Sequence, residues 1–190
     1  MIRHGKKSRP RVKKTRRNAR TQSRRAHSLR TKPGSDPRRT VASSRKLPSL
    51  AHLLRALEAE GIQAQVVGMS AAILQGVPAT TLDTDLWVNL GERQYIRVPE
   101  ICRKLGASVL APTAVALKDE SLVNFCYRID GLRSFAWEWK HSKKMRWLGL
   151  LVRVLPLERI IRSKEVIRRP KDLAHLPLLK QVLRASRRME

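Results

Sequence analysis

The chain has 190 residues, with 41 Lys and Arg against 15 Asp and Glu, so its formal net charge at pH 7 is +26. This length allows one compact domain and a tail. The two cysteines, Cys102 and Cys126, belong to no CxxC pair or His/Cys cluster, which excludes a disulfide framework and a zinc site of ordinary spacing.

The sequence also lacks the signals of membrane insertion or secretion. No apolar run reaches the roughly 18–20 residues that cross a bilayer. The basic start of the sequence has no apolar segment of the kind found in a secretory signal. We therefore expect a cytoplasmic protein that does not enter the membrane.

The first 47 residues hold 18 Lys and Arg and a single acid, Asp36. Their few apolar residues are scattered and cannot bury enough surface to offset the entropy of ordering. We predict a disordered basic tail over 1–47 and a folded domain over 48–190. Such a tail could neutralise many phosphates, which predicts salt-sensitive, sequence-indifferent binding of nucleic acid. The candidate contacts are Arg11, Lys13, Lys14, Arg16 and Arg17. A solvated extension without function is the alternative.

Helical and strand patterns alternate after the tail. Helices are predicted over 49–60, 70–75, 92–105, 157–167 and 171–187, the last broken at Pro177. Strands are predicted over 62–68, 82–90, 109–117 and 122–129, with a hairpin over 145–154 that turns at Leu148–Gly149. Trp137 and Trp139 are predicted to pack from one strand face. This interleaving predicts an α/β (α+β) fold, a mixed twisted sheet with flanking helices.

Asp83 and Asp85 lie on the strand predicted over 82–90, at a spacing that places both side chains on one face. Two neighbouring carboxylates repel each other unless a positive charge lies between them. A divalent cation, held by carboxylate oxygens and by a phosphate of the substrate, is the usual solution. The pair therefore predicts a metal site. A solvated strand end is the alternative.

The segment before this strand suits a phosphate. An apolar strand ends at Gly68, and Ser70 opens a short helix, so free backbone N–H groups face the same edge. Glycine allows a phosphate to approach closely, and the Ser70 hydroxyl can donate to it. Taken alone the segment is ordinary helix capping. Strand, Gly-x-Ser, helix and then Asp-x-Asp on a second strand is more specific.

Two segments resemble a known family. VVGMSAAILQGVPATTLDTDLWVNL resembles the signature of minimal nucleotidyltransferases of the DNA polymerase beta-like superfamily, a Gly-Gly/Ser turn followed about a dozen residues later by Asp-x-Asp. LPLERIIRSKEVIRRPKDLAHLPLL resembles a second signature, found in the abortive-infection and antitoxin-associated branches, in which a helical Lys precedes an Arg-Pro-Lys-Asp turn. The resemblance spans roughly residues 50–185.

The resemblance implies a nucleotidyltransferase fold and a role for each matching residue. Gly68 and Ser70 would contact the phosphates of an NTP, Asp83 and Asp85 would bind Mg²⁺, Lys164 would steady the triphosphate, and Lys171 and Asp172 would support the pocket.

The helical pattern supports Lys164 independently. It continues the buried stripe of Leu157, Ile160 and Ile161, and an inward Lys needs an anionic partner. A Lys that extends to solvent is the alternative there, and helix capping is the alternative for Asp172.

The sequence departs from this family where a third carboxylate is expected. Asn124 occupies that place on the strand 122–129. An amide can offer an oxygen to a metal but cannot accept a proton. Either Asp130 or Glu138 could substitute, one firmly held metal could suffice, or the fold has lost catalysis. The sequence leaves these three alternatives open.

By resemblance, the protein binds NTP and Mg²⁺ and transfers a nucleotide to RNA, tRNA included, or to protein. One alternative is a catalytically degenerate nucleotidyltransferase fold that binds nucleic acid. Another is one component of a toxin–antitoxin pair with a cognate partner protein. Among the histidines, His52, His141 and His175 are dispersed and form no catalytic pattern.

Overall fold

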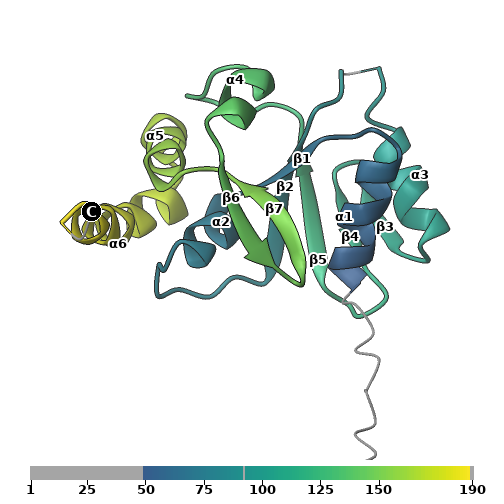
Figure 1. Cartoon of the computed structure of the whole chain (residues 1–190), viewed down its shortest axis with the longest axis horizontal. Coiled ribbons are helices and arrows are strands. Elements are labelled where there is room, and N and C mark those ends of the chain that lie inside the picture. Colours follow the sequence, from purple (N-terminus) through teal and green to yellow (C-terminus); the bar gives the residue numbers. More distant parts are fainter. Residues whose placement is uncertain (1–48, 92, 189–190) are drawn as a thin grey trace, which may run out of the picture. The chain divides into compact units, whose positions relative to one another are not determined.

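Strands at the centre of the domain form one mixed sheet, in the order β3-β4-β5-β2-β1-β7-β6 (Figure 1). The computed structural model describes residues 49–91 and 93–188, so the predicted tail and its candidate contacts lie outside the described residues. The strands are β1 (Ala64–Val67), β2 (Asp83–Val88), β3 (Ser108–Ala111), β4 (Ala114–Ala116), β5 (Leu122–Cys126), β6 (Lys143–Trp147) and β7 (Leu150–Val154).

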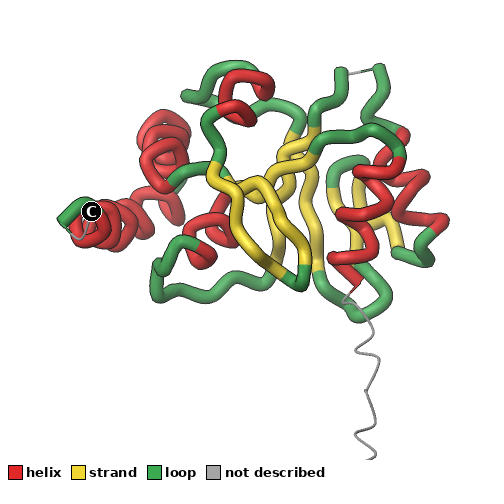
Figure 2. The backbone as a smooth tube through the Cα atoms, in the orientation of Figure 1, coloured by secondary structure: helices red, strands yellow, loops and turns green. Residues whose placement is uncertain are grey.

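Helices lie on both sides of this sheet (Figure 2). They are α1 (Ser49–Ala59), α2 (Gly68–Leu74), α3 (Arg97–Lys104), α4 (Phe135–Lys140), α5 (Leu157–Ile167) and α6 (Pro170–Ser186). The helix α1 packs on β1 and α3, α2 packs on β1, β2 and α5, and α6 packs on α5. The fold class predicted from the sequence, a mixed twisted sheet with flanking helices, is confirmed. None of the helices in the described residues has both the length and the apolar character of a membrane span.

Strand β2 has neighbours of opposite direction, and this arrangement creates the edge at which the predicted site residues meet. It runs antiparallel to β1, with Val67 opposite Asp85, and parallel to β5, with Asp85 opposite Asn124. The end of β1 and the beginnings of β2 and β5 therefore lie at one edge of the sheet.

The core explains why β1 and β2 are held so firmly. Val66 on β1 and Leu86 on β2 are fully buried, and so are Leu53 and Leu57 on the amphipathic helix α1. Burying each large aliphatic side chain contributes about 1.5–3 kcal/mol. The strands that carry the site residues are thus anchored by apolar side chains on their opposite face.

Most predicted elements are found, including the helix 49–60, the helix 157–167 and the hairpin, whose turn residues Leu148 and Gly149 both have positive φ. The strand predicted over 109–117 is instead two strands, β3 and β4, because the chain reverses at Pro112. The helix predicted over 92–105 begins only at Arg97, after a turn. The predicted break at Pro177 is also wrong, because α6 runs through this exposed proline.

The placement of Trp137 and Trp139 on one strand face is wrong. Both belong to the short helix α4, which begins after Ser134, whose Oγ accepts a hydrogen bond from the backbone N–H of Trp137 at 3.4 Å. Residues two apart on a helix point in different directions. Trp139 accordingly stacks on Phe135, whereas Trp137 stacks on His141.

Candidate functional site

A cleft of about 740 Å³ opens at the edge where β1 ends and β2 and β5 begin. Its far wall comes from α5 and α6, which follow much later in the sequence. The cleft brings together seven of the residues predicted from the sequence: Gly68, Asp83, Asp85, Asn124, Lys164, Lys171 and Asp172. We call the strand side, with Asp83 and Asp85, the acid wall, and the helical side, with Lys164, Arg169 and Lys171, the cation wall.

In the acid wall, one amide joins two carboxylates. The Nδ2 group of Asn124 donates to Asp83 Oδ2 at 2.7 Å and to Asp85 Oδ1 at 3.2 Å. The second oxygen of Asp83, Oδ1, accepts from the Thr81 hydroxyl at 2.8 Å. The register of β2 and β5 places Asn124 directly beside Asp85, so the amide occupies the position expected for a third acid.

Burial raises the pKa of Asp85, and repulsion from Asp83 adds to this, although the hydrogen bond from Asn124 lowers it. The positive charges of Lys171 and Lys164, on the opposite wall, also lower the pKa of Asp85. The two carboxylates, when ionised, repel each other, and a bound cation would reduce this repulsion.

Gly68 lets the β1–α2 turn approach this pair. Its φ is +63°, a conformation that favours glycine, and a Cβ at this position would lie only 2.2 Å from Asp85 Oδ2. Ser70, by contrast, is outside the cleft lining and 6% exposed, and its hydroxyl donates to the backbone carbonyl of Asp83 at 2.9 Å. In this structure the Ser70 hydroxyl fixes α2 to β2, and its contact with a phosphate stays a prediction.

The cation wall is organised around one buried carboxylate. Asp172, fully buried, accepts from Lys164 Nζ at 2.6 Å and from Arg169 Nε at 2.6 Å. Burial alone would raise the pKa of Asp172, but the hydrogen bonds from Arg169 and Lys164 outweigh burial and leave it lowered. Lys164 thus finds its anionic partner inside the protein, and Asp172 holds two cations at the cleft instead of capping α6.

Gln75 fixes the spacing between the walls. This residue follows α2, and its Nε2 group donates to the carbonyl of Leu155 at 2.9 Å. Its Oε1 accepts from the backbone N–H of Leu157, the first residue of α5, at 3.1 Å. One side chain therefore ties the helix after the Gly68 turn to the start of the helix that carries Lys164.

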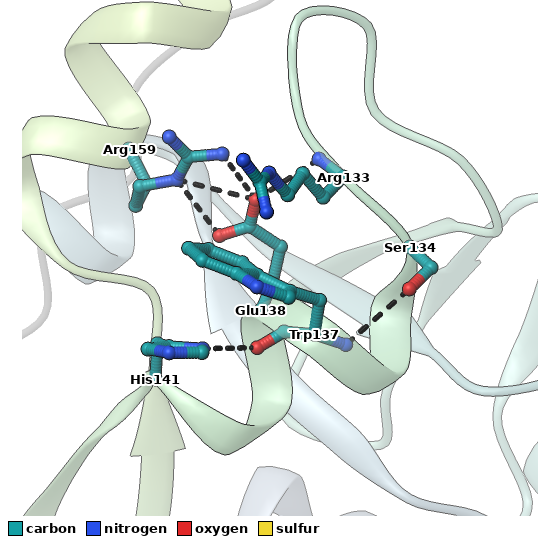
Figure 3. Close-up of polar contacts among 6 residues, drawn as sticks. All are labelled: Arg133, Ser134, Trp137, Glu138, His141 and Arg159. Carbon is teal, nitrogen blue, oxygen red and sulfur yellow. Dashed lines mark hydrogen bonds and ion pairs between the residues drawn. The ribbon is translucent and has the colours of Figure 1, made fainter.

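Glu138 does not supply the missing acid. It lies on α4, fully buried and outside the cleft lining, where it forms a bidentate ion pair with Arg159 and accepts from the backbone N–H of Arg133 at 3.0 Å (Figure 3). Asp130 does line the cleft, but it follows the end of β5 and its side chain is 65% exposed, 3.8 Å from Arg128. Of the two proposed substitutes, only Asp130 is at the site.

The acid wall suits a single hard cation. In the described residues, no group of three or more His, Cys, Asp or Glu side chains could hold a metal ion. Asp83 and Asp85 offer carboxylate oxygens, which Mg²⁺ prefers, whereas Asn124 turns its NH2 group toward them. Mg²⁺ beside phosphate is commonly held by one or two carboxylates. The residues present thus fit one Mg²⁺ ion at the Asp83–Asp85 pair.

Sequence reasoning missed two residues on the helical side of the cleft, Arg169 and His175. Both line the cleft, Arg169 as a partner of Asp172 and His175 from the next turn of α6. The spacing held a signal, because Asp172 and His175 are three residues apart on one helix and so share a face.

Comparison with known proteins gives structural similarities only. No family model matches the chain, and no curated protein matches it. Among solved structures, the chain is similar to ANT(2'')-Ia in complex with adenylyl-2''-tobramycin, with 21% identity, a TM-score of 0.48, and coverage of 73% of this chain and 90% of that one.

Two further solved structures are similar. The lincosamide antibiotic adenylyltransferase LnuA with lincomycin bound shares 11% identity, with a TM-score of 0.45 and coverage of 70% of this chain and 96% of that one. An antigenic nucleotidyltransferase-like protein from Paracoccidioides brasiliensis shares 15% identity, with a TM-score of 0.42 and coverage of 69% and 74%.

Proposed function

We propose that the protein binds a magnesium–nucleoside triphosphate complex in the cleft and transfers a nucleotide to a hydroxyl of an acceptor, RNA (tRNA included) or protein. One observation carries this proposal: a pair of strand carboxylates, Asp83 and Asp85, shares a cleft with the cation wall, next to the turn at Gly68, whose positive φ and close approach to Asp85 favour glycine. Acid on one side and excess positive charge on the other suit a metal-bound polyphosphate.

Each wall has its part in the proposed reaction. Asp83 and Asp85 would hold Mg²⁺, which when bound supplies positive charge to the reacting phosphate oxygens. Lys171 and Lys164 would neutralise the triphosphate, and Arg169 adds a third cation at the same wall. Since Asp172 balances only one of these three charges, the wall keeps the surplus that an anionic ligand requires.

Transfer requires the acceptor oxygen to bond to the α-phosphorus while the bond to the β-phosphate oxygen breaks and pyrophosphate leaves. The hydroxyl proton must go to a base. Asn124 has no basic atom, so it can position a ligand or an acceptor but cannot take this proton. Asp130, the one additional carboxylate in the cleft lining outside the β2 pair and Asp172, or solvent is the receiver in this proposal.

The donor role of Asn124 favours a second candidate function, a nucleotidyltransferase-type fold without turnover that serves as a nucleic-acid-binding module. The amide donates to both carboxylates, and this neutral bridge holds the pair together without a metal. In that case nucleic acid would bind mainly through charge, with an affinity that falls steeply with salt.

A transfer assay separates the two functions. Purified protein is incubated with Mg²⁺, each labelled NTP and total RNA, and label on RNA and on protein is measured. The first function predicts label transfer that is lost in Asp83→Ala and retained in Glu100→Ala, a substitution of an exposed acid on α3. Absence of label transfer, with RNA binding that is unchanged in Asp83→Ala and lost at high salt, supports the second. If neither transfer nor RNA binding occurs, both are refuted.

A further inference from the structure

His175 is a polar group of the cleft that neither the sequence pattern nor the proposed reaction explains. It lies on α6, one turn after Lys171 and Asp172, and it lines the cleft with them. Its Nδ1 atom is buried and has no hydrogen-bond partner among the described residues. A buried nitrogen without a partner costs free energy. Because Nδ1 is buried, the ring nitrogen that a ligand in the cleft could contact is Nε2.

The surroundings of His175 favour its neutral form. Burial lowers the pKa of the imidazole, Lys164 and Lys171 lower it further, and only Asp172 opposes them. Lys164 belongs to α5, and Lys171 and Asp172 belong to α6. His175 therefore lies with the residues of the cation wall.

A triphosphate whose reacting phosphate is held at the acid wall would place its far end at the cation wall. If the acid wall holds the metal beside the reacting phosphate, the remaining phosphates extend toward the cation wall. The wall has three cations, Lys164, Arg169 and Lys171, but one carboxylate, Asp172. A polyphosphate there would reverse the local charge that keeps the imidazole neutral, because a nearby anion favours the protonated form.

We propose that His175 contacts the terminal phosphates of a bound polyphosphate, takes up a proton from solvent as the ligand binds, and donates an N–H hydrogen bond to a phosphate oxygen. This inference rests on the proposed function, because it takes the cleft to be the triphosphate site. The proton adds to the neutral imidazole, and no P–O bond is made or broken by this step. The ligand class is a polyphosphate, whether the triphosphate of a nucleotide, inorganic triphosphate or the pyrophosphate product.

The sign of the linkage follows from the two states. In the free protein the pKa of His175 lies below its ordinary value, and the bound anion raises it. Between those two values the complex carries more protons than the free protein. Binding therefore takes up protons in the interval between the two pKa values and becomes tighter as the pH falls through it.

Calorimetric titration in two buffers of different ionisation enthalpy counts these protons. The titrants are Mg²⁺ with NTP, Mg²⁺ with inorganic triphosphate, and a nucleoside as the phosphate-free control. The full-length protein is compared with His175→Gln and with His52→Gln, a matched change of an exposed histidine on α1 outside the cleft. We expect uptake of a substantial fraction of one proton in the wild type and in His52→Gln, and none in His175→Gln. We also expect His175→Gln to bind roughly tenfold more weakly, as the loss of a hydrogen bond to a charged group predicts.

A second measurement does not depend on the variant. Imidazole resonances of histidine-labelled wild type are followed by NMR across pH, with and without saturating inorganic triphosphate. The proposal requires the pKa of one imidazole to rise on binding. If polyphosphate binds while no imidazole pKa moves, or if proton uptake and affinity are the same in His175→Gln, the role of His175 is refuted and the proposed function stands. If proton uptake occurs with the nucleoside alone, the phosphate contact is refuted. If the wild type binds neither NTP nor triphosphate, the proposed function fails and this inference fails with it.

Discussion

Replacing Gly68 by alanine tests the geometry of the acid wall most directly. The residue has a φ of +63°, and an added Cβ would lie 2.2 Å from Asp85 Oδ2 and 3.1 Å from its Cγ. Two separate costs follow. One is the left-handed backbone conformation, about 1–2 kcal/mol for a non-glycine residue. The other is displacement of the Asp85 side chain, which must move because the turn is held by backbone hydrogen bonds.

Gly61 offers a matched control for the first cost alone. Its φ is +70°, and no atom lies within 4 Å of its added Cβ. Alanine also restricts the unfolded chain, which returns about 0.4–1 kcal/mol, so Gly61→Ala should lower the free energy of unfolding by roughly 1 kcal/mol. The difference between the two variants isolates the contact with Asp85.

Displacing Asp85 adds a further loss. The side chain leaves its favoured rotamer, which costs about 0.5–1.5 kcal/mol, and its hydrogen bond from Asn124 weakens, which costs about 0.5–1.5 kcal/mol. Gly68→Ala should therefore lower the free energy of unfolding by roughly 2–4 kcal/mol. Since the moved carboxylate no longer pairs with Asp83, divalent-cation affinity should fall at least about tenfold.

Urea unfolding followed by tryptophan fluorescence measures the stability of both variants, and titration with Mn²⁺ measures cation affinity. Gly61→Ala should bind Mn²⁺ as the wild type does. The reasoning is wrong if Gly68→Ala costs no more than Gly61→Ala, or if its Mn²⁺ affinity is unchanged.

Three further predictions concern the remaining carboxylates and the amide. Asn124→Asp should place a third negative charge in the acid wall, lowering the melting temperature without metal and increasing the rise that Mg²⁺ produces; equal Mg²⁺ shifts in variant and wild type would contradict this. Asp172→Asn should lower the free energy of unfolding by about 3–5 kcal/mol, because two cations lose a buried partner. The pKa of Asp172 is lowered in the folded state, so its contribution to the free energy of unfolding is present above its unfolded pKa and is lost as the pH falls through the folded value. The free energies of unfolding of variant and wild type in urea should therefore converge in acid. A difference that persists in acid would refute the pairing. Glu138→Gln should destabilise by a similar amount through its arginine partner on α5, yet leave NTP affinity within about twofold in a binding titration; a large loss of NTP affinity would show that Glu138 acts at the cleft.

The sequence alone was sufficient to predict that Asp83 and Asp85 lie together on one strand face. Asp83 and Asp85 are two residues apart on a strand whose second half is apolar and buried, and their shared face follows from that spacing. Gly68 likewise stands where an apolar strand passes directly into a helix, with no residue between the two elements. These features are local, so a one-dimensional pattern contains them.

Contacts between distant segments were not predictable in the same way. The two-fold donation by Asn124 depends on the register between β2 and β5, which brings residues 41 and 39 positions apart within hydrogen-bond distance. From the sequence, Asp172 could either cap α6 or pair with a cation. The structure shows that its buried carboxylate accepts from Arg169. A local signal for the helix at Trp137 and Trp139 was present, because Ser134 is a good helix N-cap and Trp137 is the third residue after it.

The two hydrogen bonds of Gln75 restrict which residue can occupy this position in a sequence that preserves the cleft. That residue must donate at one end and accept at the other, toward Leu155 and Leu157, and it must be neutral. Glutamate lacks the donor, lysine lacks the acceptor, and leucine of similar size lacks both. Each of these three replacements would therefore lose at least one of the two contacts that connect Gln75 to the start of α5. In a collection of natural variants, an invariant glutamine at this place would identify chains that still align the two walls, even where Asp83 or Lys164 had changed.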